Sequence, residues 1–264
     1  MEVQERPSSL KSLGLHITDE AARPVDLPFI SLFPSIVHLR LMETNGITTI
    51  AKVRGLSERL TKLHLHLDPT PNPHPLPGVL TALSKCVNLE QLNCFYTRAP
   101  SDTGSTPSVQ LRNLTHLGMH NIMQDHRGTE LSGTLGSFKF PSLHTVEITG
   151  APESTSHTFG PGFIHLHSLA HLRISKGTTA LHCFSSNMKQ SRTGRQQLLP
   201  RLEHLELLGI EDGSEMTSVF ERLVARRQSR KKGDLATLRS IVLGFATSQE
   251  GEALTIAEDF QPVQ

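Results

Sequence analysis

The stretch Leu199-Pro200-Arg201-Leu202-Glu203-His204-Leu205-Glu206-Leu207 decides the fold of this chain. Written as a pattern, it is L-x-x-L-x-x-L-x-L, and its last five residues alternate apolar and polar. Alternation with a period of two is typical of a β-strand that buries one face and exposes the other. The stretch therefore predicts a short, half-buried strand.

The same frame returns along the whole chain. Successive copies begin roughly 24 to 36 residues apart, near or above the period of leucine-rich repeats. We therefore predict an α/β fold, an irregular leucine-rich-repeat solenoid of about eight or nine repeats, with a parallel concave sheet and with helices and loops on the convex side. The apolar positions of the other copies are Leu10, Leu13 and Leu15 (a weaker copy); Phe33, Ile36, Leu39 and Leu41; Leu60, Leu63 and Leu65; Cys86, Leu89, Leu92 and Cys94; Leu111, Leu114, Leu117 and Met119; Phe140, Leu143, Val146 and Ile148; Leu166, Leu169, Leu172 and Ile174; and Leu235, Leu238, Ile241 and Leu243.

The repeats suggest three parts of the chain. Residues 1–9 form an N-terminal extension, residues 10–246 the solenoid and residues 247–264 a C-terminal tail. The clearest predicted helix starts near Asp212, carries one apolar stripe and ends in a basic run before Gly233. A shorter helical spacing precedes Gly55, which we expect to end it.

The composition limits the partners and the compartment. The 264 residues carry a net charge of +1, so the charge balance indicates neither nucleic acid nor a membrane surface as a partner. Two of the three cysteines, Cys86 and Cys94, occupy apolar repeat positions and are expected to be buried thiols. We find no signal peptide and no long apolar run, so we expect an intracellular protein, cytoplasmic or nuclear.

The alternation also predicts which side chains face solvent on the concave side. In each strand the residues before, between and after the two core residues point outward, and this set is polar and rich in histidine, with Gly118 and Gly244 among its members. Arg173 and Glu206 fall at the same place on neighbouring strands, close enough for a cross-strand ion pair. We expect this face, toward its C-terminal half, to bind a protein. The candidate binding residues are Arg40, His64, His116, His171, Arg173, His204 and Glu206.

Two motifs allow a second interpretation. His64, His66 and Asp68 have the spacing of metal ligands, but Arg40 is predicted beside His64 and would repel a cation, so we expect solvated histidines and no metal site. The basic run at 226–232 fits a nuclear localisation signal or the end of a helix, and we favour the helix end. No motif for a nucleophile or a phosphate-binding loop is present, so we expect no enzyme and no cofactor.

The repeats resemble a known family. Phe140-Pro141-Ser142-Leu143 through Ile148, with no asparagine ladder, looks like the ribonuclease-inhibitor-like repeats of F-box proteins. The end of the chain, from Leu223 through the arginines to the strand before Phe245, is similar to the close of basidiomycete (fungal) F-box-like proteins. The resemblance implies a protein-binding module, the substrate receptor of a cullin-type ubiquitin ligase.

The family's N-terminal F-box, with its Leu-Pro-x-Glu start, is not found in this sequence. We therefore expect a ligase adaptor as a partner only if an F-box lies upstream. The alternative is a free-standing, non-catalytic scaffold with no link to a ligase. The protein target has no signature in the sequence.

Overall fold

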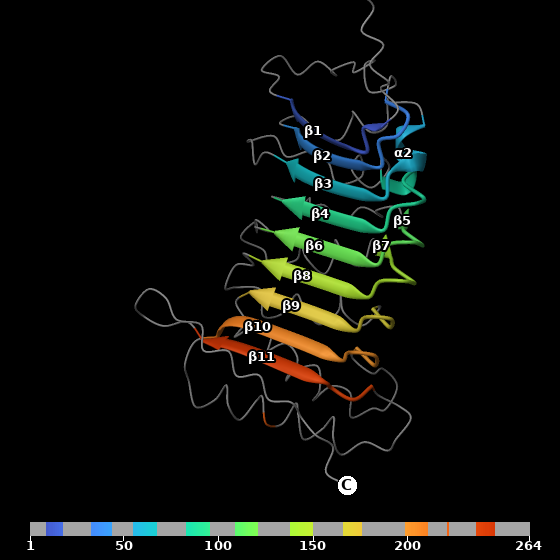
Figure 1. The fold of residues 1–264 in the computed structure, drawn as a ribbon. Coiled ribbons are helices and arrows are strands. Elements are labelled where there is room, and N and C mark those ends of the chain that lie inside the picture. Colours follow the sequence, from blue (N-terminus) through green and yellow to red (C-terminus); the bar gives the residue numbers. More distant parts are fainter. Residues whose placement is uncertain are drawn as a thin grey trace, which may run out of the picture.

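The computed structural model describes residues 9–17, 33–43, 55–67, 83–95, 109–120, 138–149, 166–175, 199–210, 221 and 236–245. Their main element is one open, all-parallel sheet of nine strands (Figure 1). Its order, β1-β2-β3-β4-β6-β8-β9-β10-β11, follows the chain, so each copy of the frame adds one strand beside the previous one. The strands are β1 (Ser12–Ile17), β2 (His38–Glu43), β3 (Lys62–Leu67), β4 (Gln91–Phe95), β6 (His116–His120), β8 (Thr145–Thr149), β9 (His171–Ser175), β10 (His204–Ile210) and β11 (Ser240–Phe245).

The first half of the frame forms a turn that precedes each strand. The N–H of Leu202 donates to the carbonyl of Leu199 at 3.2 Å, and the same bond recurs in other copies, for example from Leu169 to Leu166 at 3.3 Å. The backbone N–H groups of Glu203 and His204 then both donate to Ala170 of the preceding copy at 2.9 Å. Six described copies, those of β2, β4, β6, β8, β9 and β10, therefore turn in the same way before their strands, whereas in the copy of β3 the N–H of Leu60 donates to the Leu56 carbonyl at 3.1 Å.

The second half of the frame builds the core. Along β4, β8 and the start of β10 buried and half-buried residues alternate, and the buried ones are the apolar positions of the frame. Leu205 is 1% exposed and Leu207 is fully buried. The cross-strand register keeps these positions together, since Leu205 lies opposite Leu172 on one side and Ile241 on the other. The predicted inward and outward register is therefore confirmed.

The predicted core continues to the two ends of the sheet but is less deeply buried there. Leu10 is 38% exposed, and Leu13, Leu15 and Leu243 are only partly buried against the core. Their strands, β1 and β11, each have a neighbour on one side only, so a smaller part of each side chain is covered.

Two glycines expected on the solvent side are also buried. A Cβ atom on Gly118 would meet the side chains of Asn93 and His120, and one on Gly244 would lie 2.8 Å from the Leu208 side chain. Neighbouring side chains thus lie across both glycines, because glycine leaves them room.

Helices are few among the described residues. α2 (Leu56–Arg59) is the one helix whose bounds fall within them. Gly55 lies at its beginning, with a left-handed φ of 71°. The helical segment that Gly55 was predicted to end precedes it and lies outside the described residues. The longer helix predicted before Gly233 lies outside the described residues, except for the helical residue Glu221. Two short strands that the frame did not predict, β5 (Val109–Gln110) and β7 (Phe138–Lys139), pair with each other beside the main sheet.

Candidate functional site

The outward side chains of the sheet form one polar face. The strand register places them in rows that cross the strands. The middle row runs through Arg40, His64, Asn93, Gly118, Glu147, Arg173 and Glu206. Because consecutive parallel strands lie about 4.8 Å apart, neighbours in a row are close enough to interact.

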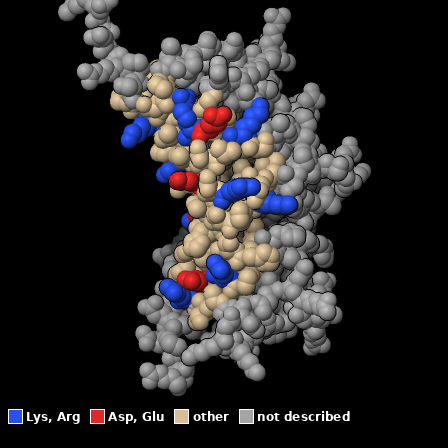
Figure 2. Space-filling model, turned by 90° about the vertical axis from the view of Figure 1, so that its right-hand side faces the viewer, with Lys and Arg blue, Asp and Glu red and all other residues tan. Residues whose placement is uncertain are grey.

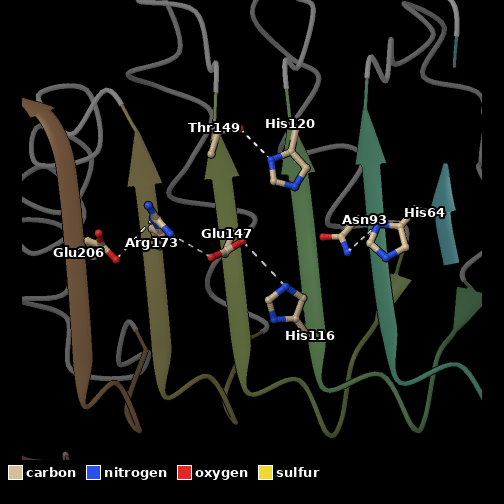
Figure 3. Close-up of polar contacts among 8 residues, drawn as sticks. All are labelled: His64, Asn93, His116, His120, Glu147, Thr149, Arg173 and Glu206. Carbon is tan, nitrogen blue, oxygen red and sulfur yellow. Dashed lines mark hydrogen bonds and ion pairs between the residues drawn. The ribbon is translucent and has the colours of Figure 1, made fainter. Parts of the chain in front are cut away.

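A charged ladder crosses the C-terminal half of this face (Figure 3). The Arg173 guanidinium lies between two carboxylates: its Nη1 is 3.5 Å from Glu147 Oε1, and its Nε is 3.5 Å from Glu206 Oε2. The other oxygen of Glu147, Oε2, lies 4.0 Å from His116 Nε2. The predicted pair of Arg173 and Glu206 is confirmed. Glu147, which joins His116 to that pair, was not among the predicted site residues.

A row of imidazoles lies beside the ladder, nearer the strand starts. The rings of His171 and His204 stack with centroids 4.3 Å apart and planes 7° apart. His204 Nδ1 forms a hydrogen bond of 2.8 Å with the hydroxyl of Ser240. On the other side of the stack, the ring of His144 lies 5.9 Å from that of His171. The predicted neighbourhood of His171 and His204 is therefore confirmed, and Ser240 orients its outer ring.

In the N-terminal half of the face, Arg40 lies opposite His64 in the register, as the sequence predicted. Asn93 Nδ2 donates to His64 Nδ1 at 3.4 Å. Figure 3 shows Asn93 and His64 on one side of His116 and His120, away from the charged ladder. The structure therefore brings the seven predicted residues together in three sets: His116, Arg173 and Glu206 in the charged ladder, His171 and His204 in the stack, and Arg40 beside His64.

An aromatic cluster that the sequence interpretation missed lies toward the strand ends. Phe95 is half-buried between two histidines, with ring centroids 5.2 Å from His66 and 4.4 Å from His120. His120 Nδ1 also forms a 2.8 Å hydrogen bond with the hydroxyl of Thr149. The sequence did contain a signal for this cluster. His66, Phe95 and His120 are each the third outward-facing residue of their strands, so the register places them side by side. The cluster offers a flat, partly apolar contact next to the polar row.

Burial shifts several of these histidines toward the neutral form. Burial is the main cause that lowers the pKa of His64, and the nearby Arg40 lowers it further. The pKa of His120 is lowered by burial, against the opposing effect of Glu147. For His171, burial again lowers the pKa most, followed by the repulsion of His204 and His144 and opposed by Glu203. The face therefore carries less positive charge near pH 6.5 than free histidines would give it.

These shifts predict that the protein loses stability as the pH falls. The unfolded chain binds protons on these histidines near pH 6.5, whereas the folded protein binds them only at lower pH, so the stabilising contribution is complete above about pH 6.5 and is lost as the pH falls through the folded pKa values. We expect a lower melting temperature at about pH 5.5 than at about pH 7.5. His171→Gln should reduce that difference. An imidazole NMR titration in which His64, His120 and His171 all have midpoints at or above 6.5 would contradict this prediction.

The described part of the chain was compared with the requirements of a metal site and of a membrane-spanning helix. No group of three or more His, Cys, Asp or Glu side chains that could hold a metal ion occurs among the residues described. His64 and His66 are described, but Asp68 lies outside. In the same part of the chain, no helix has the length and apolar character needed to cross a membrane.

Comparison with known proteins adds no assignment. No protein-family model matches the chain, and no curated protein matches it significantly. The candidate site therefore depends on the geometry of the sheet. That geometry provides fixed charges, imidazoles and one aromatic cluster on a continuous surface, which suits non-covalent recognition.

Proposed function

We propose that the chain is a leucine-rich-repeat solenoid whose polar face is the concave, protein-binding surface. The strand order that follows the chain and the turn that recurs in six of the described copies support this interpretation. Such arrays present an extended surface because each repeat packs mainly on its neighbours. The proposed mechanism is positioning: the sheet holds a target protein and requires no cofactor or catalytic group of its own.

The charged ladder is the observation that carries the proposal. The side chains of Glu147 and Glu206 are 28% and 34% exposed, whereas that of Arg173 between them is 46% exposed. The buried apolar residues point to the other side of the sheet, so the core needs none of these charges. A fixed row of alternating charges favours one partner and orientation over others.

The link to a ubiquitin ligase is part of the same proposal and depends on the family resemblance. In that role the solenoid selects the target, and the ligase partners transfer ubiquitin. Co-purification of the target, the ligase adaptor and the full-length protein would support it. If the protein binds its target but never co-purifies with a ligase adaptor, the result would favour the free-standing scaffold.

We expect charge reversals in the ladder to weaken target binding with little effect on stability. Affinity capture followed by mass spectrometry identifies the target, and calorimetry with the purified target then compares variants. Arg173→Glu or Glu206→Arg should raise Kd by about tenfold to a hundredfold, the range for charges in an interface. Both variants should melt within a few degrees of the wild type, because exposed ion pairs contribute about 0.2 to 1 kcal/mol.

The double variant Arg173→Glu/Glu206→Arg is the matched control. It restores an ion pair between the two strands but exchanges the positions of the two charges. If the target recognises each charge at its own position, the double variant should bind as weakly as the single variants. Binding that is unaffected by the ladder variants, but lost on Arg226→Glu or Lys231→Glu, would assign recognition to the basic run instead of the sheet.

A further inference from the structure

A second charged surface lies at the edge of the sheet where the strands begin. The turns of the frame line this edge, which faces the viewer in Figure 2. Blue side chains outnumber red ones on it (Figure 2). Three exposed basic residues, Lys85, Arg112 and Lys139, come from the segments that precede β4, β6 and β8, which are consecutive strands of the sheet; Lys85 and Arg112 lie in turns, and Lys139 ends β7 just before its turn. We call them the basic turn cluster.

Backbone and side-chain contacts hold the three turns together. Asn113 Nδ2, next to Arg112, donates to the carbonyl of Val87 in the turn of Lys85 at 2.9 Å. On the other side, the N–H of Leu111 donates to the Lys139 carbonyl at 3.1 Å, and Gln110 is the strand partner of Lys139. The three cations therefore project from fixed, adjacent turns. Glu90 is the one acidic residue in the described parts of these turns, residues 83–90, 109–115 and 138–144.

The surroundings of the cluster indicate a protein as its partner. Val87, in the same turn as Lys85, is 56% exposed, which is unusual for a large apolar side chain in this structure. The other exposed side chains described in these turns include Asn88, Asn113, Pro141, Ser142 and His144, and the imidazole of His144, 5.9 Å from the His171 ring, is the one exposed ring among those described there. The net charge of the chain is also only +1. A partner segment that carries carboxylates next to an apolar side chain would complement these cations and the exposed Val87.

We propose that the basic turn cluster binds an acidic, extended segment of a partner protein, at a surface separate from the polar face. In an extended chain every second side chain lies on the same side, about 6.8 Å apart, and the long, flexible side chains of lysine and arginine can cover the difference from the strand spacing of about 4.8 Å. Carboxylates of such a segment can therefore meet Lys85, Arg112 and Lys139 in succession. The partner's charge makes this binding sensitive to salt.

A fluorescent peptide of about ten glutamates is a direct probe, measured by anisotropy with the full chain at about 0.1 M salt. The triple variant Lys85→Gln/Arg112→Gln/Lys139→Gln should weaken its binding by about tenfold, the combined effect of three exposed ion pairs. Lys11→Glu is the control for the single change Arg112→Glu. Lys11 is exposed and lies just before β1. Three strand spacings of about 4.8 Å separate β1 from β4, and this distance of about 14 Å exceeds the Debye length of about 10 Å at 0.1 M salt.

The proposal holds if Arg112→Glu and the triple variant weaken peptide binding, Lys11→Glu has little effect and added salt reduces the affinity. Equal loss in the Lys11 and Arg112 variants would overturn it, because the attraction would then be general to the chain. Absence of peptide binding at about 0.1 M salt would also overturn it. A single-stranded oligothymidine of equal charge serves as the second probe. If it binds more tightly than the peptide and depends on the same three residues, the surface binds nucleic acid and the assignment is wrong.

Discussion

Cys86 and Cys94 should react with thiol reagents about a thousandfold more slowly in the folded protein than in the unfolded chain. Burial raises the pKa of both thiols from 9.0 to about 12, and the thiolate is the form that reacts. A rise of this size lowers the thiolate fraction near neutral pH by about three powers of ten. The core position of the two side chains, 1% and 8% exposed, adds a barrier to access.

The measurement is the rate of labelling at about pH 8, with the same protein in guanidinium chloride as the reference. A Cys183→Ser variant leaves Cys86 and Cys94 as the two thiols of the chain. Labelling of the folded protein at the rate of the unfolded chain would contradict the prediction. Such a result would place the cysteines outside the core and would refute the register of β4 and of the turn before it.

Leu205→Ala should lower the free energy of unfolding by about 2 to 5 kcal/mol, the range for a large-to-small change in a packed core. Leu205 is 1% exposed and lies between Leu172 and Ile241 of the adjacent strands. Removing most of its side chain leaves a cavity that strands on both sides cannot easily fill. Urea denaturation followed by circular dichroism gives the difference from the wild type.

His204→Ala is the matched control, since His204 precedes Leu205 and points to the other face. We expect it to cost about 1 kcal/mol, because the change removes one hydrogen bond to Ser240 and the stacking on His171. This cost is larger than for a free surface side chain, because the structure gives the imidazole two partners. Equal effects of the two substitutions would show that the inward and outward positions are assigned wrongly.

The repeated frame was sufficient to predict the sheet and its register. In L-x-x-L-x-x-L-x-L the alternation of Leu205 and Leu207 with polar residues is local information, because successive side chains of a strand point to opposite faces. The frame keeps the same spacing between turn and strand in each copy. For this reason the pairing of Arg173 with Glu206 and of His171 with His204 could be predicted without coordinates.

The sequence could not rank the outward residues, because the frame makes them equivalent. Glu147 has the same place in its strand as Arg173, but the frame does not show that its carboxylate reaches both Arg173 and His116. Gly118 was counted as exposed, whereas Asn93 and His120 lie over it. Such contacts depend on side-chain rotamers and on which residues of neighbouring copies meet.

The sequence by itself determined the strand positions, the core side of each strand and the order of the repeats, because these depend on hydrophobic periodicity within each copy. Only the tertiary structure decided the place of Glu147 in the charged ladder, the aromatic cluster around Phe95 and the basic turn cluster. Their members are far apart in the chain: Arg173 and Glu147, for example, are 26 residues apart. They become neighbours because parallel strands and their turns stack side by side, and the interactions between copies depend on that stacking.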